Sequence, residues 1–166
     1  ENCPLWDGRS FASVLKQGGD AGRDELILSQ CCHVCQRSVR YDKWLYIRSY
    51  HDGFHLFPRE MLFDLESDPH EQNNIAEAHP EVCREATWRL DRWHEQQMLK
   101  MAENASDVVD PLWTVIREGG PFHANRIDGR GQPTRVAEYT ERLRATGRGE
   151  GAKRIEERME TGEHVG

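Results

Sequence analysis

The 166-residue sequence lacks an apolar run long enough to span a bilayer, and it lacks a positively charged start followed by an apolar stretch. We therefore expect a soluble chain without a membrane partner, and its cellular location stays open. Basic residues are in deficit, because 22 Lys and Arg face 29 Asp and Glu, for a net charge of -7. Nucleic-acid binding depends on clustered Lys and Arg against phosphates, so we expect no nucleic-acid partner.

The cysteines are few and do not have the spacing of a disulfide-rich domain. The five are Cys3, Cys31, Cys32, Cys35 and Cys83. An odd number without framework spacing favours free thiols, buried in the core or in a pocket wall. A small zinc site built on Cys32, His33 and Cys35 is an alternative reading, but no second Cys pair follows and strand neighbours point to opposite faces. We predict no metal site in this chain.

Four segments have the β-branched and aromatic residues of strands, and short connections separate them. They cover residues 25–30, 34–40, 43–50 and 61–65. Only Tyr41-Asp42 separates the second segment from the third, which predicts a hairpin. In residues 80–104 apolar side chains recur at three- and four-residue steps, which predicts one long amphipathic helix over a face of the sheet.

The rest of the chain is predicted to be helical but poor in apolar anchors. Asp68-Pro69, with Glu71 three residues after Asp68, predicts a capping box and a helix that begins directly after the fourth strand. Beyond residue 104, helices are expected after Pro111, at 133–145 and at 152–161, with a stop at Gly119-Gly120-Pro121 and a loop at 122–131. The fold class is thus α+β: a sheet of about four antiparallel strands packed by one long amphipathic helix, with a helical extension over 105–166.

An ordered series of motifs runs through the first two thirds of the chain. It consists of Trp6-Asp7-Gly8-Arg9-Ser10-Phe11 with Val14-Leu15, Arg37-Ser38-Val39-Arg40, Lys43-Trp44-Leu45-Tyr46-Ile47, Leu62-Phe63-Asp64-Leu65, Asp68-Pro69, Glu71 and Asn74-Ile75-Ala76. The series resembles the C-terminal subdomain of the sulfatase family over about residues 5–102. The resemblance implies a subdomain over 1–104, with a lead-in at 1–24, the sheet at 25–65 and the long helix at 80–104.

Sulfatases hydrolyse sulfate esters or sulfamates with a formylglycine, made from the first residue of a Cys/Ser-x-Pro-x-Arg motif, and with a calcium ion held by carboxylates. This chain contains no such motif, and in Ser49-Tyr50-His51-Asp52-Gly53 the His and Asp stand in the wrong order for the family's calcium motif. The resemblance therefore implies the C-terminal part of a sulfatase. Formylglycine and calcium are expected in a catalytic N-terminal domain outside this chain. No catalytic residue is predicted here, and the isolated chain is expected to be inactive.

Ser29-Gln30-Cys31-Cys32-His33 resembles a Ser-Gln-x-x-His stretch that leads toward the catalytic domain in sulfamidase-like members. The resemblance implies that His33 lines one wall of the substrate pocket. Arg37, His51, His55 and Arg59 are further candidates to bind an anionic, sulfated substrate. A histidine satisfied by backbone at a strand end, and solvated surface charges, are the alternatives.

The expected partner is the catalytic domain of the parent chain, which this subdomain would support. A free-standing binding module that kept the subdomain without the enzyme is the rival interpretation. Leu26 and Leu28 alternate with Ile27, so apolar residues occur on both faces of the first strand. That pattern is typical of a sheet covered twice. For the isolated chain we predict that another copy supplies the second cover, as a homo-oligomer.

Overall fold

The computed structural model describes residues 5, 8, 10–19, 23–53, 55–117 and 136–161. Some of the predicted features lie outside the described residues: parts of the lead-in motif (residues 6, 7 and 9), Cys3, the stop at Gly119-Gly120-Pro121 and the loop at 122–131.

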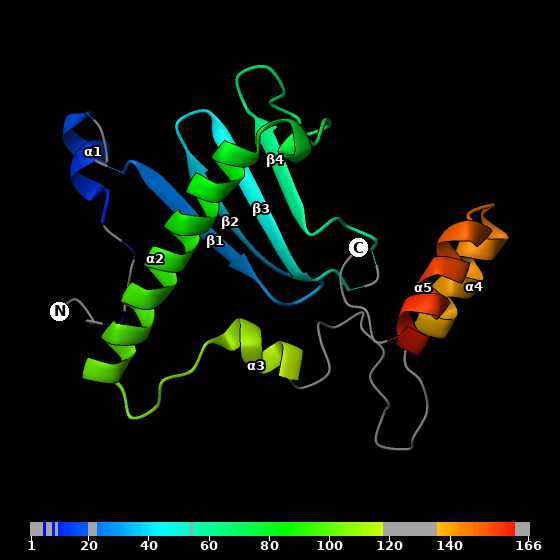
Figure 1. Cartoon of the computed structure of the whole chain (residues 1–166). Helices are drawn as coiled ribbons and strands as arrows, with labels where there is room; N and C mark the ends of the chain where they lie inside the picture. Colours follow the sequence, from blue (N-terminus) through cyan, green and yellow to red (C-terminus); the bar gives the residue numbers. More distant parts are fainter. Residues whose placement is uncertain are drawn as a thin grey trace.

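Four strands form one antiparallel sheet in the order β1-β2-β3-β4. The strands are β1 (Glu25–Gln30), β2 (Cys35–Tyr41), β3 (Trp44–His51) and β4 (Glu60–Asp64). The helix α2 (Pro80–Asn104) crosses one face of the sheet (Figure 1). Its 25 residues extend over about 37 Å at 1.5 Å per residue. The predicted α+β class and the long helix are confirmed.

The core lies between the sheet and α2. Val39, Tyr46 and Leu62 are register partners on three adjacent strands and so share one face. They pack in a single buried cluster with Ala86 and Leu90 of α2. The three- and four-residue steps in the helix sequence thus place its apolar stripe on this face of the sheet.

The turn between β2 and β3 differs by one residue from the expectation. Tyr41 pairs with Trp44, so the two turn residues are Asp42 and Lys43. Asp42 adopts a positive φ of 46°, a conformation that Asp tolerates better than most residues. The hairpin is therefore as predicted, but Tyr41 belongs to the strand.

The predicted helix entry at Asp68-Pro69 is wrong. The Asp68 carboxylate accepts hydrogen bonds from the backbone N–H groups of Gln72 and Asn73, both at 2.8 Å, but these residues form a loop. Glu71 has a positive φ of 55°, which no helix residue adopts. A short 3₁₀-helix, η1 (Ala76–Ala78), precedes α2, which begins only at Pro80. Asp68 therefore fixes a loop rather than a helix terminus.

The loop after β4 is used to close the outer edge of that strand. The Asn74 side chain accepts a hydrogen bond from Leu62 N at 3.0 Å and donates one to the Glu60 carbonyl at 3.1 Å. Ile75 N donates to the Leu62 carbonyl at 3.0 Å. Because an open edge strand is a template for unwanted pairing, these bonds protect β4.

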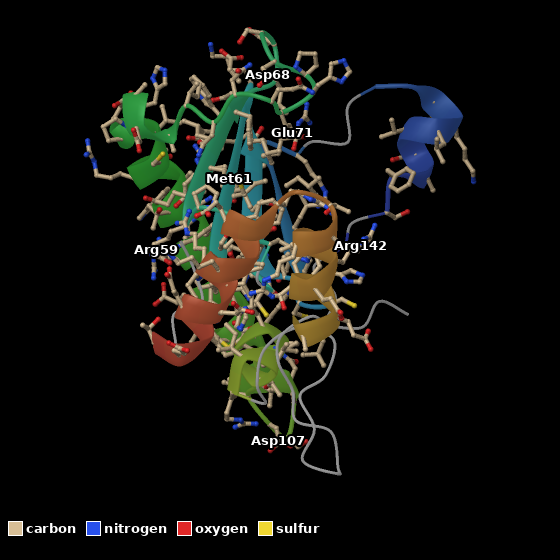
Figure 2. The ribbon with its side chains drawn as sticks, turned by 90° about the vertical axis from the view of Figure 1, so that its right-hand side faces the viewer. Arg59, Met61, Asp68, Glu71, Asp107 and Arg142 are labelled. Atoms are coloured by element: carbon tan, nitrogen blue, oxygen red, sulfur yellow. The ribbon has the colours of Figure 1, made fainter. Side chains whose placement is uncertain are left out.

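The extension contains three of the remaining helices, and a fourth precedes the sheet. They are α1 (Ala12–Gln17), α3 (Pro111–Arg117), α4 (Val136–Ala145) and α5 (Gly149–Thr161). The helices α4 and α5 form a hairpin whose own small core contains Leu143, Ala152 and Ile155. This hairpin lies beyond the end of the sheet in Figure 1, and the 90° view of Figure 2 has it in front of the strands, away from Asp68 and Glu71. None of the described helices combines the length and apolar character that crossing a bilayer requires.

Candidate functional site

Three of the predicted site residues lie at one end of the sheet. His33 lies in the loop between β1 and β2, His51 ends β3, and His55 lies in the loop that follows. The two loops pack closely, because a Cβ added at Gly53 would come 2.1 Å from the His33 carbonyl oxygen. Gly53 also has a positive φ of 58°. Glycine is therefore required at this position, both for the contact and for the backbone conformation.

His51 is buried, and its Nδ1 accepts a hydrogen bond from Gly53 N at 3.0 Å. Because Nδ1 is the acceptor, the proton of the neutral ring resides on Nε2. His51 therefore fixes the turn at the end of β3.

His55 is partly buried, and this burial lowers its pKa below the ordinary value. The nearby Asp52 carboxylate opposes the shift, whereas His33 adds to it. The His55 ring lies 6.0 Å from the rings of Phe57 and Tyr139. With a lowered pKa, His55 is neutral at pH 7, so it offers a hydrogen bond rather than a positive charge to an anion.

A buried ion pair links this end of the sheet to the C-terminal hairpin. Asp52 is completely buried, and both of its carboxylate oxygens accept hydrogen bonds from Arg158 of α5, at 2.8 and 3.0 Å. Sequence reasoning missed this pair. The pair could have been anticipated from the three-residue spacing of Ala152, Ile155 and Arg158, which places the arginine on the apolar face of α5.

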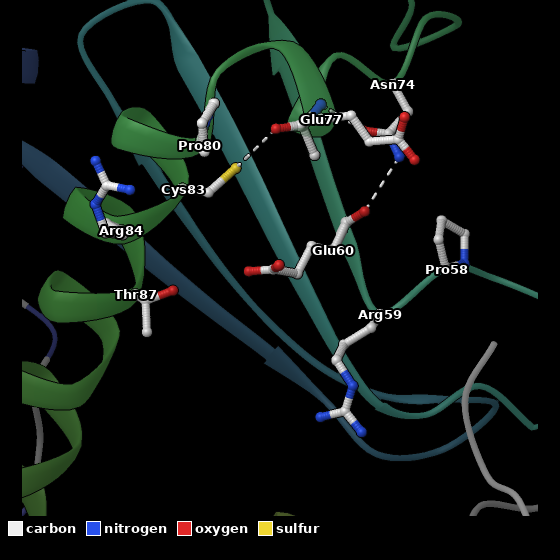
Figure 3. A pocket seen from close by; sticks show the side chains of 10 residues that line it. Pro58, Arg59, Glu60, Asn74, Glu77, Pro80, Cys83, Arg84 and Thr87 are labelled. Atoms are coloured by element: carbon white, nitrogen blue, oxygen red, sulfur yellow. Dashed lines mark hydrogen bonds between the residues drawn. The ribbon is translucent and has the colours of Figure 1, made fainter.

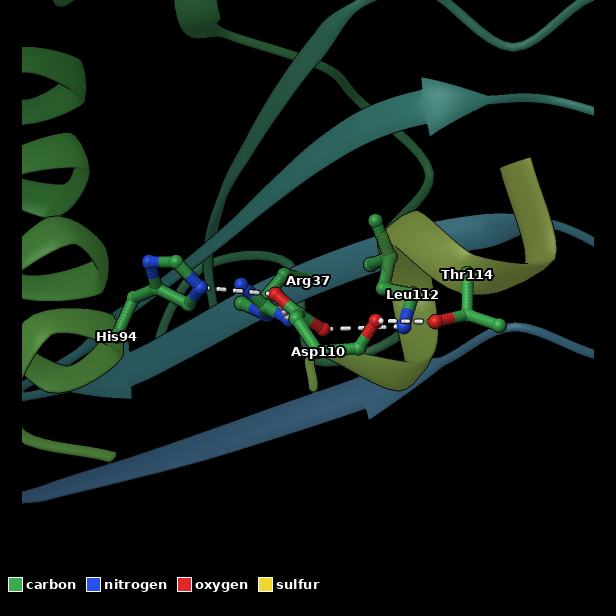
Figure 4. Close-up of polar contacts among 5 residues, drawn as sticks. All are labelled: Arg37, His94, Asp110, Leu112 and Thr114. Atoms are coloured by element: carbon green, nitrogen blue, oxygen red, sulfur yellow. Dashed lines mark hydrogen bonds and ion pairs between the residues drawn. The ribbon is translucent and has the colours of Figure 1, made fainter. Parts of the chain in front are cut away.

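Arg37 lies apart from the three histidines. It is buried on the α2 side of the sheet, where its guanidinium donates to both oxygens of Asp110 at 3.0 Å (Figure 4). The guanidinium also lies 5.1 Å from the Trp93 ring centre, and His94 Nε2 lies 2.9 Å from the same Asp110 carboxylate. Asp110 in turn accepts a hydrogen bond from Leu112 N at 3.0 Å. The structure thus places Arg37 in the joint between β2 and α3.

Arg59 is exposed and lines a groove between β4 and the first half of α2 (Figure 3). The groove has a volume of about 580 Å³. Arg59 and Arg84 bring positive charge to it, and Glu60 and Glu77 bring negative charge. These balanced charges do not favour an anion over a cation.

The donor atoms at the sheet end do not fit a calcium ion. Calcium needs several converging oxygen ligands, and both oxygens of Asp52 are bonded to Arg158. Within the described ranges, no group of three or more His, Cys, Asp or Glu side chains is placed to hold a metal ion. The zinc alternative on Cys32, His33 and Cys35 therefore has no ligand set among these residues.

No protein-family model and no curated protein matches the sequence. The fold is similar to parts of solved structures. One is a Bacteroides thetaiotaomicron protein designated 6S-sulf and described with the metabolism of multiple glycosaminoglycans, with 23% identity and a TM-score of 0.41. Another is yidJ from Bacteroides fragilis, described as a putative sulfatase, with 22% identity and a TM-score of 0.40. Each match covers 52% of this chain and 19% of the solved one, so the chain matches about a fifth of their length.

Proposed function

We propose that this chain is the C-terminal subdomain of a sulfatase and supports a catalytic domain that supplies the formylglycine and the calcium ion. The observation that carries the proposal is the sheet face opposite α2. Leu26 and Leu28 point to this face and are 39% and 48% exposed. Such an apolar surface in a chain with few apolar residues is explained by a second layer that packs on it.

The register of the strands shows how far this face extends. One row runs from Leu26 across Arg40 and Leu45 to Phe63. The next row consists of Leu28, Ser38, Ile47 and Met61. In Figure 1 the α4–α5 hairpin lies beyond the end of the sheet. Leu45 and Phe63 are buried within this chain, whereas Leu26, Leu28 and Arg40 are exposed. The exposed part of the two rows on β1 and β2, which we call the open face, is the proposed contact with the catalytic domain.

The residues that carry the sulfatase resemblance have structural roles. Asp64 accepts hydrogen bonds from Glu66 N and Ser67 N at 3.1 and 3.4 Å and forms an ion pair with Lys43 at 2.8 Å. Asn74 closes the edge of β4. These contacts support a role as a rigid scaffold, because each fixes a turn or an edge and none brings a nucleophile to a base.

At the sheet end, His33 and His55 are the residues that we assign to the substrate-facing wall. His33 is exposed and His55 is partly exposed, whereas His51 is buried in the turn and Arg37 is engaged by Asp110. The neutral imidazole of His55, whose pKa is lowered by burial, can donate an N–H to a sulfate oxygen without the cost of burying a charge. The substrate itself, whether an aryl, carbohydrate or N-sulfate, is selected by the catalytic domain.

The test uses the protein expressed from the whole reading frame. The double variant Leu26→Asp and Leu28→Asp places two charges on the open face, and Leu99→Asp places one on an exposed position of α2 as the control. We expect the double variant to lose at least about tenfold in aryl sulfate hydrolysis and to unfold at a lower temperature, because buried unpaired charge is costly. Full activity and unchanged melting in the double variant would show that no catalytic domain covers this face.

A further inference from the structure

Two cysteines flank the loop that connects β1 to β2. Gln30 and Gln36 form the last register pair of the two strands, and Gln30 Nε2 donates to Gln36 Oε1 at 2.9 Å. The two side chains therefore lie on the same face of the sheet. Cys31 directly follows the last residue of β1, and Cys35 is the first residue of β2, at the point where the register with β3 shifts. Extending the register of the Gln30–Gln36 pair by one residue places Cys31 opposite Cys35, with both thiols on the other face.

The spacing of such cross-strand neighbours suits a disulfide. Facing residues of an antiparallel pair have Cα atoms roughly 4.5–5.5 Å apart, and a disulfide needs roughly 4.4–6.8 Å. The two sulfur atoms also interact electrostatically, because a Cys31 thiolate disfavours ionisation of Cys35. All four described cysteines, Cys31, Cys32, Cys35 and Cys83, are free thiols in this structure.

We propose that Cys31 and Cys35 are a reversible thiol–disulfide couple that takes a small-molecule disulfide of the glutathione type as its oxidant. Cys31 is partly exposed and Cys35 is completely buried, so the oxidant reacts first at Cys31. The Cys31 thiolate attacks one sulfur of the oxidant and releases one glutathione. The Cys35 thiolate then attacks the Cys31 sulfur and releases the second. The protein loses two electrons and two protons, and one disulfide is reduced to two thiols.

The second step has a characteristic pH dependence. Burial, with a smaller contribution from Cys31, raises the pKa of the Cys35 thiol to about 11. The thiolate fraction of Cys35 therefore rises about tenfold for each pH unit from 7 to 10. Ring closure should accelerate over this range, and the mixed disulfide at Cys31 should accumulate at the lower end.

Oxidation would constrain the loop that carries His33. The disulfide joins the two ends of this loop, and the His33 carbonyl already packs against Gly53. The proposed couple therefore acts on one of the residues that we assign to the substrate-facing wall, but the disulfide itself does not depend on that assignment. A negative sulfatase assay would not contradict the proposed disulfide, and a failure to form the disulfide would not contradict the proposed sulfatase role.

The experiment measures thiols in the folded, reduced chain. The chain is incubated with oxidised glutathione at pH 8 and at pH 9.5, alkylated and digested with trypsin. The peptide spanning residues 24–37 contains three of the five cysteines. We expect this peptide to carry one alkylated thiol, at Cys32, and to be lighter by two hydrogens. Fragmentation should place the ring between Cys31 and Cys35, and reduction should restore all three thiols.

Matched variants distinguish a specific disulfide between Cys31 and Cys35 from oxidation of any accessible thiol. Cys32→Ser should retain the intramolecular disulfide, whereas Cys31→Ser and Cys35→Ala should abolish it. Circular dichroism establishes that each variant is folded. In Cys35→Ala the mixed disulfide between Cys31 and glutathione should persist, because no second thiol resolves it. A folding defect would not produce this result. A ring that joins Cys32 to either neighbour, or glutathione on Cys32 alone with Cys31 and Cys35 still free, would overturn the proposal.

Discussion

The Asn74 side chain bonds to the outer edge of β4, where the backbone of a fifth strand would otherwise pair. It bonds to both Leu62 N and the Glu60 carbonyl. We predict that Asn74→Ala lowers the free energy of unfolding by about 1–3 kcal/mol, since the partly buried Leu62 N–H loses its acceptor and the Glu60 carbonyl loses its donor. Urea denaturation measures the change. Gln72→Ala is the control, because Asp68 contacts only the backbone of Gln72; equal losses in the two variants would contradict the edge-closing role.

Asp68 and Glu71 have different roles in the loop after β4, so their substitution should have different effects. Asp68→Ala should cost about 0.5–2 kcal/mol, because two backbone N–H groups lose their acceptor. Glu71 has a positive φ of 55°, so Glu71→Gly should be neutral or stabilising by up to about 1 kcal/mol. Thermal unfolding of both variants provides the measurement. A clear loss of stability in Glu71→Gly would restore a side-chain role for this residue.

Cys35 makes stability depend on pH on the alkaline side. Burial raises the pKa of the Cys35 thiol from its ordinary value of 9.0 to about 11 in the folded chain. A raised folded-state pKa favours the thiol form, so this contribution is complete below pH 9 and is lost as the pH rises toward 11. We predict that wild type loses more stability than Cys35→Ala between pH 8 and pH 10.5. Parallel urea titrations compare the two proteins, and identical slopes would show that Cys35 is solvated.

At the scale of elements, the α4–α5 hairpin depends on the pair between Arg158 and Asp52. Arg158→Met removes the guanidinium that faces the buried Asp52 carboxylate, which should cost about 3–5 kcal/mol or release the hairpin. The double variant Asp52→Leu and Arg158→Met removes both charges and should recover most of the loss. Hydrogen exchange of α5 reports the release. Arg144→Met, which removes the exposed pair with Glu156, is the control and should cost less than about 1 kcal/mol.

The strands and the long helix could be predicted from the sequence because their signals are local. Alternating residues in β2 and β3, and three- and four-residue steps in α2, depend only on near neighbours. The predicted helix entry at Asp68 is wrong because Asp-Pro occurs both at helix N-termini and in turns. The turn is formed here because the loop must place Asn74 against the edge of β4. That requirement depends on β4 being an edge strand, which no local pattern reveals.

The candidate site was harder to predict because its partners are distant in the chain. The sequence identified His33, His51 and His55, and the packing of two loops brings them to one end of the sheet. Arg37 was grouped with them, but its partner Asp110 lies 73 residues away and holds it in the joint with α3. The Asp52–Arg158 pair spans 106 residues. Only the tertiary fold reveals such pairings.

At the scale of the whole molecule, the isolated chain leaves the open face without its proposed partner. We therefore predict self-association at micromolar concentration, with Leu26 and Leu28 at the contact. Sedimentation velocity should detect a dimer for wild type and a monomer for the double variant Leu26→Asp and Leu28→Asp. A monomeric wild type would show that the open face does not drive self-association in the isolated chain.

We propose that these 166 residues are the non-catalytic part of a sulfatase. The most direct measurement is aryl sulfate hydrolysis by the purified chain and, in parallel, by the protein expressed from the whole reading frame, each with and without calcium. The proposal predicts no turnover by the chain alone and no stabilisation of it by calcium. It predicts calcium-dependent turnover by the longer protein, which should contain a Cys/Ser-x-Pro-x-Arg motif upstream of Glu1. Turnover by the purified chain, or a reading frame without that motif, would contradict it.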